Sequence, residues 1–196
     1  MKKQSLSGPA IFMYSVMALT ALVAAAGFVI HYTGICENTA VLWTGIVSFM
    51  ILYHFGLRIF MGEITKRFAI DYNHFWFKER RFEKPLYRLL FIRKWKDKVL
   101  TFDPAAYDFA NRTPHQLATT MSKSELDHWI NEIISVVSIF FSLIWGCFPA
   151  FFISAVAAML FDAQFIIVQR YNRPIVLRLM KRMERKKTAA KQPANV

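Results

Sequence analysis

Cysteine is scarce in this sequence of 196 residues, and the common motifs of soluble enzymes are missing. Cys36 and Cys147 are its two cysteines, too few for a disulfide framework and without metal-ligand spacing. We expect two separate thiols, with a disulfide between them as the alternative. The sequence also lacks a Gly-rich phosphate loop, zinc-type spacing and a G-x-S-x-G elbow. We therefore expect no metal, and a covalent cysteine enzyme is disfavoured.

Acidic residues are also few. The chain has 13 Asp and Glu against 25 Lys and Arg, a formal net charge of +12, yet hydrophobic residues make up 55% of it. High hydrophobicity with a basic excess is typical of a membrane protein whose charges lie on one side. A nucleic-acid-binding protein would share the charge but not the long uncharged runs, so we expect no nucleic-acid partner.

These uncharged runs predict an all-α integral membrane protein. A helix needs ~20 apolar residues to cross the hydrocarbon core, and we expect four spans at about 9–30, 40–62, 130–147 and 149–168. The first run is too long for a signal-peptide core and is taken as a retained span. Gly146 and Pro149 divide the last long run in two.

The remaining segments are basic and polar. Residues 63–128 form a large loop that contains an interfacial helix opened by Pro85. We expect residues 174–187 to form an amphipathic helix on the membrane surface, starting at Pro174. We expect residues 188–196 to form a disordered tail. We expect residues 1–187 to form a single membrane domain.

The distribution of charge predicts the orientation in the membrane. All 25 Lys and Arg lie in the amino-terminal segment, the end of the second span, the large loop or the carboxyl-terminal segment. Because Lys and Arg concentrate on the cytoplasmic side, we expect both termini and the loop there. Membrane lipids are the expected surroundings.

Polar residues gather at the cytoplasmic ends of the spans. His54 and Arg58 are four residues apart and share a helix face, and Glu125, His128 and Glu132 stack on another. The fourth span ends in further polar side chains: Asp162, Gln169, Arg170, Asn172 and Arg173. Ionisable groups in membrane spans are costly and usually face a cavity or a partner, so this pattern predicts a site.

The residue types at this site favour general-base chemistry. A neutral His128 oriented by Glu125 or Glu132 can accept a proton from a hydroxyl group. The arginines can hold an oxyanion or an anionic donor group. Alkyl or acyl transfer to a hydroxyl fits this set.

Structural roles can explain the same residues. His128 can sit in the headgroup layer, and His54 and Arg58 can pair with Glu63 or Asp162 to lock the helices together. Arg170 and Arg173 can be snorkelling anchors, and the basic loop can be a patch attracted to anionic lipid.

Three segments resemble a known family. RKWKDKVL (93–100), KSELDHW (123–129) and IIVQRYNRP (166–174) are similar to the glycosyl-4,4'-diaponeurosporenoate acyltransferase family. Glu125 and His128 match the E-x-x-H of the second block. The resemblance implies a bacterial cytoplasmic membrane enzyme, an O-acyltransferase that places a fatty acyl chain on a hydroxyl of a lipid-linked sugar, such as a glycosylated carotenoid or a glycolipid.

Chemistry and position assign the expected roles. His128 is the base, Glu125 orients it, and His54 is a second acid/base or a substrate contact. The expected substrate-binding residues are Arg58, Trp95, Lys96, Glu132, Gln169, Arg170, Asn172 and Arg173. No bound cofactor is expected, and the donor is an acyl thioester of coenzyme A or acyl carrier protein.

Two other functions stay open. One is a non-catalytic lipid-binding or assembly protein. The other is a small lipid transporter, against which the apolar outer halves of the first three spans argue. The sequence leaves the acceptor and the oligomeric state undetermined.

Overall fold

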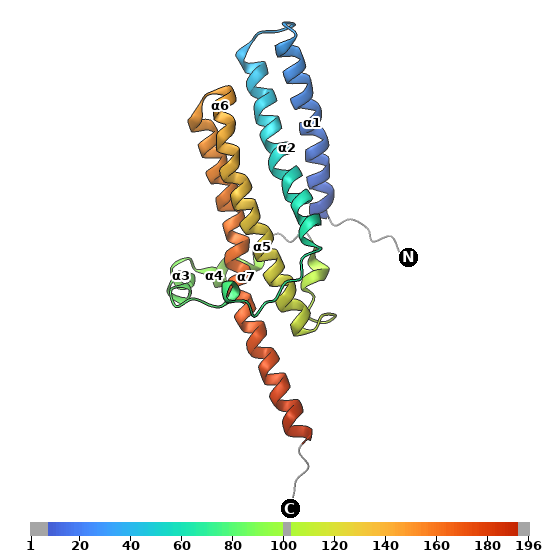
Figure 1. Ribbon diagram of the computed structural model, residues 1–196, viewed down its shortest axis with the longest axis vertical. Helices are drawn as coiled ribbons and strands as arrows, with labels where there is room; N and C mark the ends of the chain where they lie inside the picture. Colours follow the sequence, from blue (N-terminus) through green and yellow to red (C-terminus); the bar gives the residue numbers. More distant parts are fainter. Residues whose placement is uncertain (1–7, 100–102, 192–196) are drawn as a thin grey trace, which may run out of the picture. The chain divides into compact units, whose positions relative to one another are not determined.

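The structure, a computed structural model, describes residues 8–99 and 103–191 and is helical throughout (Figure 1). Helices account for 82% of it, and these residues contain no strand. Four helical segments are long and apolar enough to cross a membrane: Ala10–Tyr32, Thr39–Thr65, Pro114–Trp145 and Phe148–Ala189. This confirms the predicted all-α class with four helices able to span a membrane.

The chain divides into two compact units. Among the described residues, the first contains 8–67 and 130–160, and the second contains 68–99, 103–129 and 161–191. The long helices α5 (Pro114–Ser138) and α7 (Phe148–Lys191) contribute to both.

In the first unit, α1 (Gly8–Tyr32) and α2 (Thr39–Thr65) lie side by side (Figure 1). The Asn38 side chain caps α2 by accepting a hydrogen bond from the Ala40 N–H at 2.8 Å. A Cβ atom on Gly27 would lie 2.9 Å from the Gly45 Cα. Small residues let helix backbones approach this closely in membranes, so the two glycines set the α1–α2 contact.

The core of the first unit is apolar and aromatic. Ile46, Met50 and Phe151 form its buried cluster, and the Trp145 ring stacks on Phe151 with centroids 6.2 Å apart. Such ring contacts add to the free energy of apolar burial.

The predicted break between the third and fourth spans is confirmed. α5 continues through the short helices η4 (Ile139–Phe141) and α6 (Ser142–Trp145). Gly146 and Cys147 then take positive φ values of 72° and 52°, and α7 begins at Phe148. Pro149 is tolerated because the first turn of a helix needs no donor there. Cys36 and Cys147 are both free thiols.

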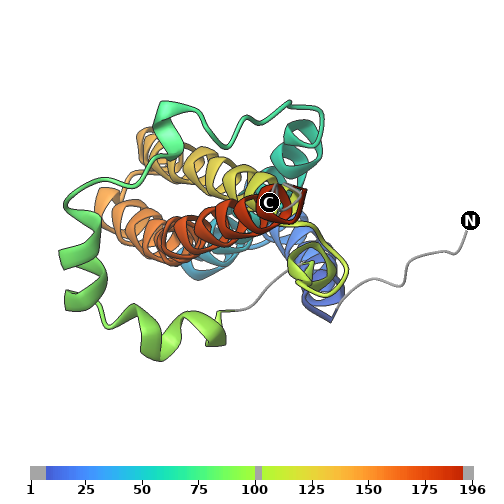
Figure 2. The same ribbon diagram turned by 90° about the horizontal axis from the view of Figure 1, so that it is seen from below.

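The second unit packs short helices around the lower parts of α5 and α7 (Figure 2). Its short helices are η1 (Phe75–Phe77), α3 (Glu83–Leu89), α4 (Ile92–Trp95), η2 (Lys96–Lys98) and η3 (Pro104–Tyr107). Its buried core joins Leu117, Ala118 and Met121 of α5 to Val176 of α7.

Two predicted boundaries are wrong. Residues 114–128, assigned to the loop, form the first half of α5. Pro174 does not start a separate surface helix, because α7 runs through it to Lys191. A proline inside a helix removes one backbone hydrogen bond, but Val176, 2% exposed, packs into the core two residues later. Of the predicted tail, 188–191 are helical and 192–196 lie outside the described residues, as do residues 1–7.

Candidate functional site

Four charged side chains of the second unit, Glu83, Glu125, Arg170 and Arg173, form an ion cluster. Glu125, on α5 and 0% exposed, accepts from Arg170 Nη1 at 2.5 Å and from Arg173 Nη1 at 2.6 Å. Arg170 also donates to Glu83 of α3, from Nη2 at 2.6 Å and from Nε at 2.9 Å. Two carboxylates thus balance two guanidinium groups, of which Arg173 is buried and Arg170 is 14% exposed. Buried charges persist when they are paired in this way.

The same arginines hold the backbone of η1 and the residue after it. Arg170 donates to the carbonyls of Trp76 and Lys78, each at 3.3 Å, and Arg173 donates to the carbonyl of Phe77 at 2.6 Å. The Arg173 guanidinium also lies over the Phe77 ring, 5.0 Å from its centroid. Three consecutive carbonyls therefore depend on two side chains of α7. The cluster therefore holds residues 76–78 against α5 and α7.

This cluster bears on two predicted roles. Glu125 does not orient His128, because both of its oxygens accept from arginines. The substrate-binding role of Arg170 and Arg173 stays a prediction, but all three nitrogens of Arg170 already donate in the structure. Arg173 donates from both Nη atoms, while its buried Nε has no hydrogen-bond partner among the described residues. Because a guanidinium has a fixed set of donors, Arg170 can bind an extra anion only by giving up partners.

His128 pairs with Asp162 instead. The His128 Nδ1 and an Asp162 carboxylate oxygen lie 2.8 Å apart, joining α5 to α7 within the second unit. The Asp162 side chain is 0% exposed and that of His128 is 19% exposed. The imidazole can therefore meet a ligand while its carboxylate partner stays buried.

An aromatic ring fixes the plane of the imidazole. Phe165 stacks on His128 with centroids 4.4 Å apart and an angle of 3° between the planes. Asp162 holds one ring nitrogen while Phe165 limits rotation of the ring. A neutral imidazole that donates through Nδ1 has its lone pair on Nε2, which is the form needed for a general base.

Asp162 was not among the expected catalytic residues, although the sequence held a signal for it. It is an acidic residue inside the run predicted to be the fourth span, and such residues are usually functional or paired. Glu83 was also missed. It lies in a basic loop with several other charges, and nothing in the local sequence marks it as buried.

Gln169 and Asn172 flank the ion cluster on α7. Gln169, 7% exposed, donates to the hydroxyl oxygen of Tyr107 at 3.3 Å, and Asn172 is half-buried. Burial raises the pKa of Tyr107 to about 12, so this phenol stays neutral at physiological pH. Burial, reinforced by the hydrogen bond to Glu83, also raises the pKa of Tyr87 in α3.

The remaining predicted residues are dispersed. Trp95 donates from its indole to the Leu90 carbonyl at 2.9 Å, and Lys96 pairs with Asp97 at 2.6 Å. His54, Arg58 and Glu132 belong to the first unit and are half-buried there. The roles of all five in substrate binding or catalysis stay predictions.

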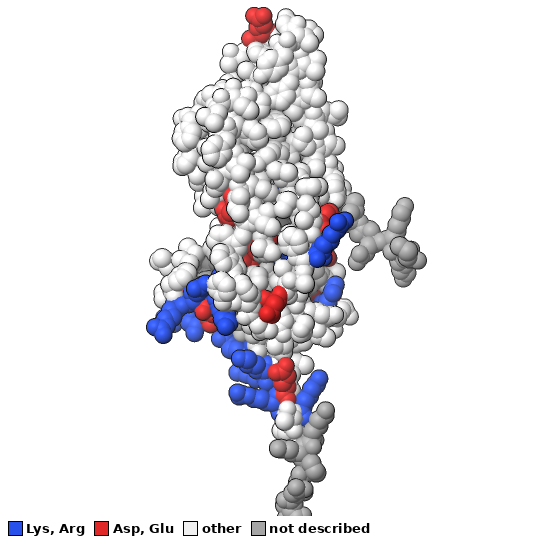
Figure 3. All heavy atoms as spheres, viewed as in Figure 1, with Lys and Arg blue, Asp and Glu red and all other residues white. Residues whose placement is uncertain are grey.

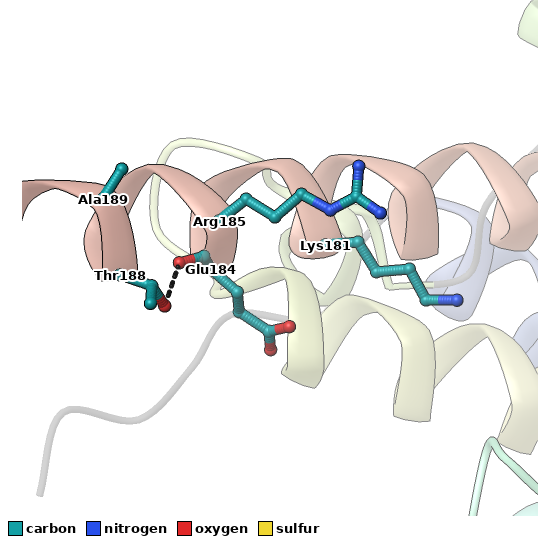
Figure 4. A pocket seen from close by; sticks show the side chains of 5 residues that line it. All are labelled: Lys181, Glu184, Arg185, Thr188 and Ala189. Atoms are coloured by element: carbon teal, nitrogen blue, oxygen red, sulfur yellow. Dashed lines mark hydrogen bonds between the residues drawn. The ribbon is translucent and has the colours of Figure 1, made fainter.

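A surface pocket lies on the carboxyl-terminal part of α7. It is lined by Lys181, Glu184, Arg185, Thr188 and Ala189, which project from one helix (Figure 4). One helix cannot enclose a ligand, so we assign no site to it. Within the described ranges, no group of three or more His, Cys, Asp and Glu side chains is placed to hold a metal ion.

Comparison with known proteins identifies the protein family. No curated protein and no solved structure matches the chain. The family model described as glycosyl-4,4'-diaponeurosporenoate acyltransferase matches residues 73–182, more than half of the sequence. The match contains Glu83, the His128–Asp162 pair and both arginines of the ion cluster. The chain therefore belongs to the glycosyl-4,4'-diaponeurosporenoate acyltransferase family.

Proposed function

We propose that the protein is a multi-pass membrane O-acyltransferase in which the His128–Asp162 pair is the general base. It moves a fatty acyl group from a thioester to a hydroxyl of a lipid-linked sugar, such as a glycosylated carotenoid or a glycolipid. The observation that carries this proposal is the 2.8 Å contact between His128 Nδ1 and the buried Asp162 carboxylate. Family membership supports the acyl-transfer class.

The chemistry follows from this geometry. Nδ1–H donates to Asp162, so Nε2 accepts the proton of the acceptor hydroxyl as its oxygen attacks the thioester carbonyl carbon. The carbon–sulfur bond then breaks, and the proton passes from Nε2 to the departing sulfur. The products are an ester and a thiol, and the imidazole returns to its neutral form. Asp162 stabilises the imidazolium that exists between the two proton transfers.

The surroundings of the pair suit an amphiphilic acceptor. Phe165 covers one face of the imidazole, and Phe161 packs edge-on against Phe165 at 5.2 Å. Phe161 is 48% exposed and Trp129, next to His128, is 38% exposed. Apolar rings around one partly accessible polar group are typical of sites that bind a lipid-like molecule and act on its polar end.

The donor in this proposal is acyl-coenzyme A or an acylated carrier protein. Both are anionic, and the net charge of +12 favours their approach. We place the site near the cytoplasmic face of a bacterial cytoplasmic membrane, with both termini inside, because of the distribution of Lys and Arg.

The direct test is acyl transfer by the full-length protein reconstituted in lipid. The protein is given a labelled acyl thioester and a glycosylated carotenoid or glycolipid with a free sugar hydroxyl. The proposal predicts an ester product with the wild type and none above background with His128→Ala. A non-catalytic lipid-binding protein would form no product in either case. Lipid analysis of a deletion strain provides the cellular counterpart, since a glycolipid lacking one acyl chain should accumulate.

A further inference from the structure

Three consecutive apolar residues are exposed where α3 ends and before α4 begins. Leu89, Leu90 and Phe91 are 73%, 37% and 62% exposed. Phe82, the residue before the first residue of α3, is 65% exposed. We call Leu89–Phe91 the apolar turn. A contiguous exposed apolar group of this kind usually marks a surface that contacts a membrane or another protein.

The apolar turn is held in a defined conformation. Phe91 has a φ of 50°, a left-handed conformation that is rare and costly for a bulky side chain. The backbone N–H of Leu90 donates to the Leu86 carbonyl at 2.9 Å, and the backbone N–H of Phe91 donates to the Arg88 carbonyl at 3.1 Å. The indole of Trp95 donates to the Leu90 carbonyl. These bonds maintain a strained turn that presents its side chains outward.

Buried neighbours anchor the turn from the other side. Ile92, directly after Phe91, is 0% exposed. Glu83 and Tyr87, one turn apart on α3, are 3% and 9% exposed and hydrogen-bonded to each other at 2.7 Å. α3 therefore buries Glu83 and Tyr87, while Leu89 lies on its exposed side together with Lys84 and Arg88.

Basic residues surround the apolar turn. Residues 78–98 contain nine Lys and Arg against three Asp and Glu. Arg88, Arg93 and Lys94 next to the turn are exposed, and the Lys94 ammonium lies 5.0 Å from the Phe91 ring centroid. Lys and Arg atoms gather on this segment in Figure 3. Apolar side chains ringed by cations are the pattern of segments that enter an anionic bilayer interface.

We propose that the apolar turn inserts Leu89, Leu90 and Phe91 into the interface of an anionic phospholipid bilayer, while Arg88 and Lys94 bind the headgroup phosphates. Charge decides between this partner and a second copy of the chain. Two copies meeting at this surface would bring their basic residues together, and like charges oppose such a contact. An anionic bilayer offers acyl chains to the apolar side chains and phosphates to the basic side chains. The segment is thus a lipid-dependent anchor outside the four long helices.

The test places a reporter on the turn of the full-length protein. In a Cys36→Ser, Cys147→Ser background, Leu89→Cys carries an environment-sensitive fluorophore without changing the strained Phe91. Asn111→Cys, exposed in the same unit, is the control. Each protein is placed in nanodiscs of phosphatidylcholine alone or mixed equally with phosphatidylglycerol, with or without brominated acyl chains.

We expect the label at position 89 to shift to the blue and be quenched by bromine in the mixed lipid, while the label at 111 stays in water. Arg88→Gln and Lys94→Gln should each lower the ratio of inserted to free turn about fivefold. A label at 89 that stays in water in both lipids would overturn the proposal. So would a blue shift in detergent that grows with protein concentration, because that result identifies a second copy as the partner. Neither result requires catalysis, so the acyltransferase proposal is tested separately.

Discussion

Arg173 donates from Nη1 to a Glu125 carboxylate oxygen at 2.6 Å, and the two side chains are 1% and 0% exposed. The other Glu125 oxygen accepts from Arg170. Removing one member of such a cluster leaves an uncompensated charge in a place that water does not reach. The cluster is therefore a structural requirement of the second unit, whatever that unit binds.

Glu125→Gln should destabilise the protein strongly. The amide keeps the shape of the side chain but leaves the Arg173 guanidinium without its carboxylate, and breaking a buried pair costs about 3–5 kcal/mol. Unfolding in mild detergent, followed by circular dichroism, measures the effect. Glu63→Gln is the matched control, because its pairing with Lys66 is exposed and should contribute no more than about 1 kcal/mol. Equal midpoints for the two variants would contradict this role of the cluster.

Gly27→Ala should loosen the α1–α2 contact. The added Cβ would lie 2.9 Å from the Gly45 Cα, a backbone atom that cannot turn aside. Overpacking of this kind costs about 1–3 kcal/mol, visible as a lower melting temperature in detergent. Gly62→Ala has open space around its Cβ and should leave the melting temperature unchanged. If both variants melt like the wild type, the two helices do not depend on this close approach.

Labelling of cysteines in intact cells tests the orientation. Cys147, exposed in the structure, should react from outside with a membrane-impermeant maleimide, because the connections without Lys and Arg belong on the outer face. A single cysteine in place of Asn111, in a background without other cysteines, should react only after permeabilisation. The reverse pattern would place both termini outside and overturn the predicted orientation.

Phe165→Leu should lower the rate of acyl transfer without unfolding the protein. Phe165 stacks on the His128 imidazole, and small misplacements of a catalytic group can lower rates as much as about 100-fold. Comparison of kcat with the melting temperature separates positioning from stability. Phe161→Leu is the control, since Phe161 contacts Phe165 rather than the imidazole, and its kcat should fall less. Equal losses in both variants would argue against a specific role for the stack.

Local physical rules predict the helices well. An uncharged run can cross the membrane as a helix only if it is long enough, and its length can be read from the sequence. Length and composition therefore predict the four apolar helices. Gly146 and Pro149 mark the break between α6 and α7 because a positive φ and a missing donor act locally. The helix start predicted at Pro174 was wrong because local rules do not decide the structure there. The packing of Val176 against α5 is a tertiary effect that outweighs the local cost of the proline.

The pairings within the candidate site needed three-dimensional information. Spacing places Glu125 and His128 close together on one helix, which made Glu125 the natural partner of the imidazole. The rotation of α5 against α7 decides instead that Glu125 meets the arginines and His128 meets Asp162. A sequence without aligned relatives cannot define that rotation. It did indicate that buried ionisable groups would gather here, and in the second unit they do.

The most direct test of the account is the single-turnover rate of acyl transfer by Asp162→Asn, measured beside the wild type at saturating donor. Asparagine fits the space of the aspartate but cannot stabilise the imidazolium or enforce the tautomer with its proton on Nδ1. We expect a rate about 100- to 10,000-fold lower with an unchanged melting temperature. A wild-type rate in the folded variant would contradict the assignment of the His128–Asp162 pair as the catalytic base.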